Sequence, residues 1–130
     1  MIKLFGSLLM ASVMFLTTSG FTPDHTVPLK KKEESKLYWY TDFQKANEES
    51  TKTGKPIFGF FTGSDWCGWC IRLQKAVFSK DEFINWASEK VILLELDFPK
   101  RTAQPENIKN QNAQLAKAFN VRGYPTVWIF

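Results

Sequence analysis

Trp66-Cys67-Gly68-Trp69-Cys70 is the segment of this 130-residue chain that decides both its fold and its chemistry. It holds the only two cysteines of the sequence, and the apolar run 57–61 lies shortly before it. We predict a helix that begins at Cys67, so that the helix N-terminus favours the nucleophilic thiolate form of this residue. A thiolate at this position can attack a disulfide, and Cys70 can then expel the bound partner. The segment therefore predicts redox chemistry.

The composition is that of one folded domain. Hydrophobic residues make up 44% of the chain, with 12 Phe and 5 Trp, so we expect an apolar core that needs no disulfide framework. The formal net charge of +4 arises from 17 basic and 13 acidic residues that are largely interleaved. Because no stripe of Arg and Lys alternates with aromatic residues, we expect no nucleic-acid partner.

Residues 1–20 have the pattern of an export signal peptide. Lys3 supplies a positive start, the stretch 4–16 is mostly apolar, and small residues follow at 17–20. The apolar stretch is shorter than the ~20 residues that span a bilayer, although an uncleaved membrane anchor remains the alternative. We therefore expect an exported protein, periplasmic or secreted, that meets the membrane only through this signal. In such a compartment a cysteine pair can persist in the oxidised state.

Residues 21–36 have the composition of a linker. Pro23 and Pro28 interrupt regular structure, and Lys30-Lys31-Lys32-Glu33-Glu34 is a solvated charge run. His25 is the only histidine of the chain, and we expect it to be exposed and without a catalytic role. The folded domain is therefore predicted at 37–130.

Within this domain the hydrophobic pattern predicts alternating strands and helices. Strands are expected at 57–61, 91–96 and 126–130, and residues 37–40 form either a short strand or an aromatic segment that packs on the core. Helices are expected from about 42 to 53, from 67 to about 78, over a shorter stretch after Ser79 that includes 83–86, and from about 106 to 119. The order predicts an α/β fold in which the strands at 57–61 and 91–96 pair in parallel.

The helix ends carry their own signals. Two pairs have the spacing of a capping box and are expected to begin the first and third helices: Thr41 with Gln44, and Ser79 with Glu82. Gly54 is expected to end the first helix, and Asn120 to cap the last helix in the left-handed conformation.

This arrangement resembles the thioredoxin family. The shared features are a strand before Trp66-Cys67-Gly68-Trp69-Cys70, then a strand and a helix, then Gly123-Tyr124-Pro125-Thr126 before another strand. The sequence of residues 61–70 is similar to that of exported bacterial thioredoxin-like proteins. The resemblance covers about residues 39–130. It implies a thioredoxin-like fold, with a central mixed sheet flanked by helices.

The resemblance also implies roles for individual residues. Cys67 would be the attacking thiol and Cys70 the resolving thiol. Pro125 would follow a cis peptide bond and face the disulfide, where the neighbouring backbone pairs with an extended substrate segment. The substrate-binding surface implied in this way consists of Trp66, Gly68, Trp69, Tyr124 and Pro125. A core position for Trp66 remains the alternative.

The chain departs from the family pattern in its proton acceptor. Phe61 stands at the sequence position of the buried Asp of thioredoxin, and Leu93 stands near that of its partner Lys. The group that takes the proton during resolution is therefore open between water, Asp65 and an unidentified residue.

Two further departures concern the redox direction and the C-terminus. Trp69 replaces the Pro of thioredoxin, and potentials across such folds range from ~−270 to ~−120 mV, so the direction stays open. The family continues after the strand at 126–130 with an edge strand and a helix. We therefore expect a C-terminally incomplete domain and a truncated sequence, with one strand edge unpaired.

The predicted function is that of an extracytoplasmic thiol–disulfide oxidoreductase acting on cysteine-containing proteins, with an unidentified thiol electron donor or acceptor. No cofactor is expected, since the cysteines carry the electrons. A non-catalytic protein-binding module is the alternative. Metal or haem is disfavoured, because structural zinc takes four ligands and a c-type haem needs His at the position of Ile71.

Overall fold

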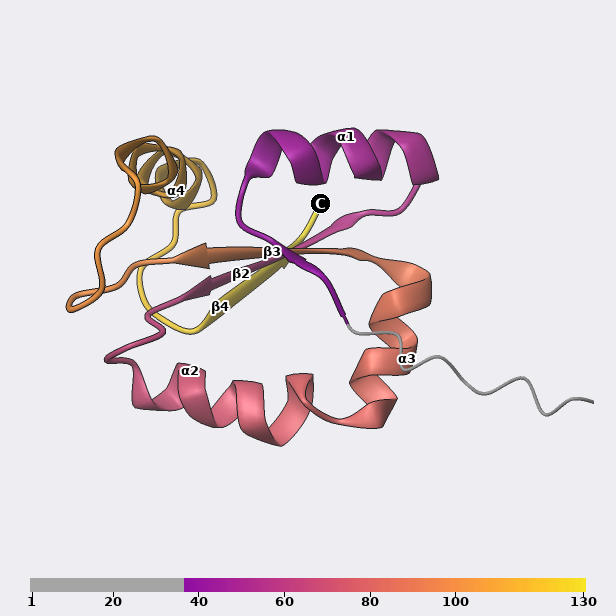
Figure 1. The fold of residues 1–130 in the computed structure, drawn as a ribbon, viewed down its shortest axis with the longest axis horizontal. Coiled ribbons are helices and arrows are strands. Elements are labelled where there is room, and N and C mark those ends of the chain that lie inside the picture. The colour runs from indigo at the N-terminus through magenta and orange to yellow at the C-terminus, as the bar shows by residue number, and fades with distance from the viewer. Residues whose placement is uncertain (1–36) are drawn as a thin grey trace, which may run out of the picture. The chain divides into compact units, whose positions relative to one another are not determined.

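The computed structural model describes residues 37–130, which form a four-stranded mixed sheet with helices on both faces (Figure 1). The predicted signal peptide at 1–20 and linker at 21–36, including His25, lie outside the described residues. None of the helices in the described range has the length and apolar character needed to span a bilayer. In chain order the elements are β1 (Trp39–Tyr40), α1 (Phe43–Thr53), β2 (Ile57–Thr62), α2 (Gly68–Leu73), the π-helix η1 (Gln74–Phe78), α3 (Asp81–Lys90), β3 (Ile92–Asp97), α4 (Glu106–Ala118) and β4 (Thr126–Ile129).

The strand β2 is the centre of the sheet, whose order is β1-β3-β2-β4. It pairs with β3 in parallel, as the sequence predicts, and with β4 in antiparallel. All residues of β2 are buried, because helices cover the sheet from both sides. This explains why its sequence is a continuous apolar run rather than an alternating one. The chain leaves this buried strand directly into the cysteine segment.

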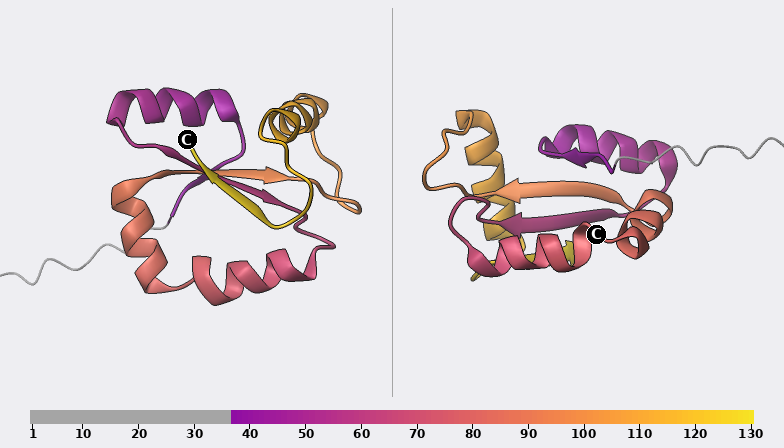
Figure 2. Two further views of the ribbon diagram at one scale, coloured as in Figure 1. Left: turned by 180° about the vertical axis from the view of Figure 1, so that it is seen from behind. Right: turned by 60° about the horizontal axis from the view of Figure 1, so that its bottom comes forward.

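The pleat of β2 divides the core into two apolar clusters on opposite faces of the sheet. Figure 2 shows the helices that cover these two faces. The disulfide cluster lies under α2, η1 and α3 and contains Phe58, Phe60, Cys67, Cys70, Phe78, Ala87, Val91 and Leu93. The second cluster lies under α1 and α4 and contains Ala46, Ile57, Phe61, Ile92, Leu94 and Leu96.

Two predicted helix caps are wrong, and two are confirmed. The side chain of Asp42, not Thr41, caps α1 by accepting from the N–H of Lys45 at 3.2 Å. The helix α3 follows Lys80 without a side-chain cap, because the Ser79 hydroxyl instead donates to the carbonyl of Gln74, the first residue of η1. Both left-handed ends occur as expected, with φ of 70° at Gly54 and 52° at Asn120.

The strand β4 lies at one edge of the sheet and pairs only with β2 among the described residues. Its side chains are largely exposed, including those of Trp128 and Ile129. That this edge reflects a truncated sequence stays a prediction.

Phe78 joins the helices to the sheet in the disulfide cluster. Its ring lies 4.9 Å from that of Phe60 and 4.7 Å from that of Phe83, measured between centroids. We expect Phe78→Ala to lower the free energy of unfolding by about 3–5 kcal/mol, because it leaves a cavity in the core. Urea denaturation measures this loss. The adjacent exposed Val77 provides a control, since Val77→Ala should change stability by no more than about 0.5 kcal/mol. Equal losses in both variants would contradict the assigned packing.

Candidate active site

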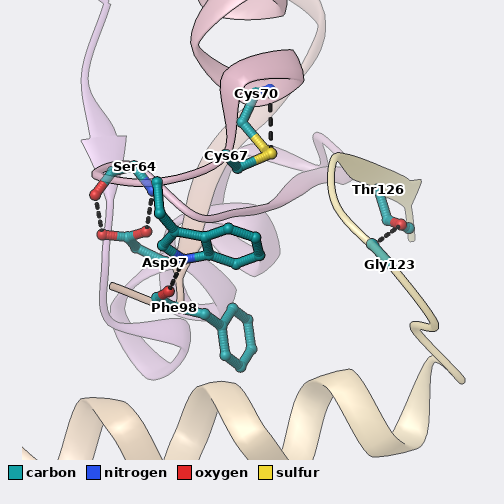
Figure 3. Close-up of a disulfide and its surroundings, with 8 residues drawn as sticks. Ser64, Cys67, Cys70, Asp97, Phe98, Gly123 and Thr126 are labelled. Carbon is teal, nitrogen blue, oxygen red and sulfur yellow. Dashed lines mark hydrogen bonds between the residues drawn. A yellow bond between two sulfur atoms is a disulfide. The ribbon is translucent and has the colours of Figure 1, made fainter. Parts of the chain in front are cut away.

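The site begins with a disulfide between Cys67 and Cys70 at the start of α2 (Figure 3). The S–S distance is 2.08 Å and the Cα–Cα distance is 5.2 Å. Cys67 is the N-cap of the helix, in an extended conformation, and Cys70 lies in the first turn. The turn from β2 places Cys67 there, because its N–H donates to the carbonyl of Gly63 at 2.8 Å.

The two sulfurs differ in their surroundings. The Sγ of Cys67 accepts a hydrogen bond from the N–H of Cys70 at 3.2 Å. After reduction, this N–H and the helix N-terminus stabilise a negative charge on Cys67. Cys67 retains 6% of its surface and Cys70 only 1%. The less buried cysteine is therefore also the one whose thiolate the helix stabilises.

Asp97 ties the turn before Cys67 to the end of β3. Its carboxylate accepts from the N–H of Ser64 at 2.8 Å and from the hydroxyl of Ser64 at 2.6 Å (Figure 3). Sequence reasoning did not identify either residue. The position of Asp97 directly at the end of the predicted strand could have indicated this contact, because a carboxylate there lies next to the loop that follows the neighbouring strand.

Asp65 ties the same turn to the loop that follows β3. Its carboxylate accepts from the backbone N–H groups of Lys100, Arg101 and Thr102 at 2.9, 2.7 and 2.9 Å. These bonds, led by that of Lys100, lower the pKa of Asp65 to about 2. Asp65 is therefore a weak base, which argues against one of the proton acceptors that the sequence left open.

Trp66 packs between the disulfide cluster and the loop that follows β3. Its Nε1–H donates to the carbonyl of Phe98 at 2.8 Å, and its ring lies 5.8 Å from that of Tyr124. The ammonium of Lys100 lies over the indole, 3.9 Å from its centroid. The side chain is partly buried against the disulfide cluster, so it joins the core while keeping one exposed part.

Pro125 and Trp69 both line an apolar groove along α2 and η1. The Tyr124–Pro125 peptide bond is cis, as the family resemblance implies. The side chain of Trp69 is 69% exposed. The groove measures about 350 Å³, and the residues that line it are Trp69, Arg72, Leu73, Ala76, Val77 and Pro125.

The structure thus brings together some of the predicted site residues. Cys67 pairs with Cys70, Trp69 shares the groove with Pro125, and Trp66 contacts Tyr124. Gly68 is exposed at the first position of α2, and a Cβ there would meet nothing within 4 Å. Sequence reasoning missed the remaining groove residues on α2 and η1, although their helical spacing from Trp69 could have indicated a shared face.

Phe61 lies on the other side of the sheet from the disulfide. It belongs to the second cluster, whereas Phe60 belongs to the disulfide cluster with Cys67 and Cys70. The residue that stands at the sequence position of the family's buried Asp therefore does not face the cysteines. Among residues 37–130, no three His, Cys, Asp or Glu side chains are grouped in a way that could hold a metal ion.

Position 63 requires glycine because the indole of Trp66 packs directly against it. A Cβ at position 63 would meet the indole at 2.5 Å, whereas one at Gly68 would meet nothing within 4 Å. We expect Gly63→Ala to lower the free energy of unfolding by about 1–3 kcal/mol through overpacking. Gly68→Ala should leave it unchanged or raise it by about 0.5–1 kcal/mol, since Ala favours a helix. Denaturation midpoints compare the two variants, and equal midpoints would contradict the close packing of Trp66 on Gly63.

Comparison with known proteins agrees with this geometry. The chain is similar to the disulfide bond reductase DsbH of Chlamydia pneumoniae, with 39% identity over 89 residues, covering 68% of this chain and 53% of the relative. It is also similar to the thioredoxin-related protein DsbJ of the same organism, with 31% identity over 96 residues, covering 74% of this chain and 28% of the relative. The chain thus spans about half the length of the first relative and less of the second.

Solved structures show the same fold. A structure described as DsbH oxidoreductase superposes with a TM-score of 0.71 and 35% identity, covering 86% of this chain and 75% of the other. A thioredoxin from Thermus thermophilus superposes with a TM-score of 0.53 and 18% identity, covering 72% of this chain and 63% of the other, which shows the fold alone. The thioredoxin-like domain family matches residues 43–130. The chain therefore belongs to the thioredoxin-like domain family.

Proposed function

We propose that this protein is a thiol–disulfide oxidoreductase that exchanges disulfides with cysteine-containing proteins through Cys67 and Cys70. The observation that carries the proposal is the disulfide at the N-terminus of α2, where the sulfur of the less buried cysteine accepts a helix N–H. The disulfide bond reductase name of one relative supports the same chemistry. The cysteines themselves carry the electrons, so the reaction needs no prosthetic group.

The exchange proceeds in two displacements. The thiolate of Cys67 attacks a partner disulfide, which forms a mixed disulfide and releases the first partner sulfur as a thiolate. Cys70 then attacks the Sγ of Cys67, the internal disulfide forms, and the second partner sulfur leaves. The partner gains two electrons and the cysteine pair loses two. The reverse sequence oxidises a partner, and the potential of the pair against the electron donor or acceptor sets the direction.

The groove along α2 and η1 suits an extended polypeptide. Its lining is almost entirely apolar, and the backbone at Tyr124 lies next to the cis-proline. A substrate segment could pair with this backbone by a short β-type contact while an apolar side chain enters the groove. We therefore propose that Trp66, Gly68, Trp69, Tyr124 and Pro125 form the substrate-binding surface.

The proposed site of action is outside the cytoplasm, in the periplasm or beyond it. The signal-like pattern at 1–20 supports this location, and an oxidised cysteine pair persists in such compartments. A thiol donor or acceptor of unidentified nature would regenerate the pair.

Single cysteine variants test the assigned roles. Cys70→Ser should accumulate mixed disulfides with partner proteins, because the second displacement is blocked, whereas Cys67→Ser should accumulate few. Non-reducing electrophoresis after acid quenching measures both. Equal trapping by the two variants would overturn the order of attack. If the folded wild-type protein does not accelerate insulin reduction by dithiothreitol over the blank, the non-catalytic binding module becomes the better interpretation.

Trp69→Ala tests the groove. We expect kcat/KM for insulin reduction to fall about 10-fold, which corresponds to the loss of roughly 1.4 kcal/mol of substrate binding. The rate with a small aromatic disulfide should not change, because such a substrate does not fill the groove. Trp128→Ala is the matched control, since it removes an exposed indole that packs on Phe119 of the other sheet face. A loss of insulin activity in the control variant alone would refute the assignment of the groove.

A further inference from the structure

Two stretches of the chain near the disulfide, 66–80 and 98–105, contain basic residues and no acidic residue. Their basic residues are Arg72, Lys75, Lys80, Lys100 and Arg101. The two stretches lie side by side, because the Nε1–H of Trp66 donates to the carbonyl of Phe98 at 2.8 Å. The side chains of these adjacent stretches therefore carry charge of one sign, although the charges of the whole chain are largely interleaved.

Two of these cations lie over the tryptophans that flank Cys67 in the sequence. The ammonium of Lys100 lies 3.9 Å from the centroid of Trp66, and the guanidinium carbon of Arg72 lies 5.5 Å from that of Trp69. The face of an indole attracts a cation, and a long basic side chain in this position keeps its charged end in water. Both basic residues are exposed. The two tryptophans thus hold positive charge at the surface beside the cysteine segment.

No carboxylate among residues 37–130 forms an ion pair with Arg72 or Lys100, since the ion pairs of this range lie within α1 and α4. The carboxylate of Asp65 accepts the backbone N–H of Lys100 at 2.9 Å, so it fixes the main chain of this residue and is not paired with its ammonium. The carboxylate of Asp97 accepts from Ser64. The charges of Arg72 and Lys100 can therefore pair with a carboxylate of a bound partner.

The groove along α2 and η1 brings one of these cations to the surface that a partner would cover. Among the described residues that line the groove, Arg72 alone is charged. In an extended polypeptide, side chains two residues apart lie on one face, about 7 Å from each other. A partner segment that directs its cysteine toward Cys67 therefore directs the residues two positions before and after that cysteine toward the surface that carries Arg72 and Lys100.

We propose that Arg72 and Lys100 select partner polypeptides that carry an acidic side chain two residues from the reacting cysteine. This inference rests on the disulfide exchange proposed above and adds to it the charge of the substrate. The planar guanidinium of Arg72 can bind a carboxylate through two parallel N–H···O bonds, whereas the ammonium of Lys100 acts as a compact charge. Complementary charges raise the rate of encounter, so we expect the preference in the first displacement.

Peptides of matched sequence test this preference. Each peptide has one cysteine, bound to a 2-thiopyridyl group, with Glu, Gln or Lys two positions before and after it. The Cys67 thiolate of the reduced protein attacks the peptide sulfur, and the mixed disulfide forms. The pyridyl sulfur leaves with the electron pair and takes a proton from water as 2-thiopyridone, whose release stopped-flow absorbance follows.

The second-order rate constants carry the result. At low salt we expect the Glu peptide to react about 5-fold faster than the Gln peptide, and the Lys peptide to react more slowly than both. In about 1 M salt, where the screening length is ~3 Å, the three rate constants should converge.

Charge variants assign the preference to the two residues. Arg72→Gln and Lys100→Gln should each lower the ratio of the Glu to the Gln rate constant to about 2, and the double variant should lower it to about 1. Lys100→Arg should keep the ratio, because it keeps the charge. Lys90→Gln is the matched control, since this exposed residue lies where β3 begins, at the opposite end of the strand from the loop 98–105. The ratio cancels any change in the general reactivity of the thiol.

Equal rate constants for the Glu and Gln peptides with the wild-type protein at low salt would overturn this inference, and an uncharged apolar segment would then be the better occupant of the groove. A preference that persists in the double variant would overturn the assignment to Arg72 and Lys100. Absence of a fast reaction with all three peptides would instead contradict the proposed function.

Discussion

The turn from the buried strand β2 into α2 is the constraint on which the site depends. It places Cys67 at the helix N-cap, where its sulfur accepts the N–H of Cys70, and it holds the second sulfur in the core. Three separate contacts hold this turn: the bond from Cys67 N–H to the carbonyl of Gly63, and the two carboxylates of Asp65 and Asp97. Because backbone groups and charged acceptors hold the turn, the sulfur geometry does not depend on the exposed rim around it.

The acidic residues near the disulfide divide into two kinds. Asp65 and Asp97 are saturated with N–H and hydroxyl donors, so they serve as fixed acceptors that join loops. Glu95 stands on an apolar face without such donors, and burial raises the pKa of its carboxyl group. A carboxylate thus joins loops where donors surround it, whereas burial without donors disfavours its charged form. The difference lies in the number of hydrogen bonds available to the charged form.

Local patterns explain what could be predicted from the sequence. The buried apolar run before Cys67 and the parallel pairing of β2 with β3 follow from the hydrophobic pattern, and the structure contains both. The cis bond before Pro125 was implied by the family resemblance, and it is present too. The predicted helix caps at Thr41 and Ser79 are wrong because the extended N-cap residues are Asp42 and Lys80, and the Ser79 hydroxyl donates to the carbonyl of Gln74 instead. The sequence did not indicate the position of Glu95, because this residue lies within an apolar run. Only its pairing with Phe60 shows that it lies on the sheet face of the disulfide cluster.

Disulfide exchange at this site depends on the thiolate of Cys67, and the alkylation rate of Cys67 as a function of pH measures its ionisation directly. In the reduced protein, with the sites of modification identified by mass spectrometry, we expect Cys67 to react first. We expect its midpoint to lie at least about one unit below the ~8.5 of an ordinary thiol. Cys70 should remain unmodified under the same conditions. A midpoint at the ordinary value, or faster modification of Cys70 than of Cys67, would contradict the claim that the helix N-terminus activates the first cysteine.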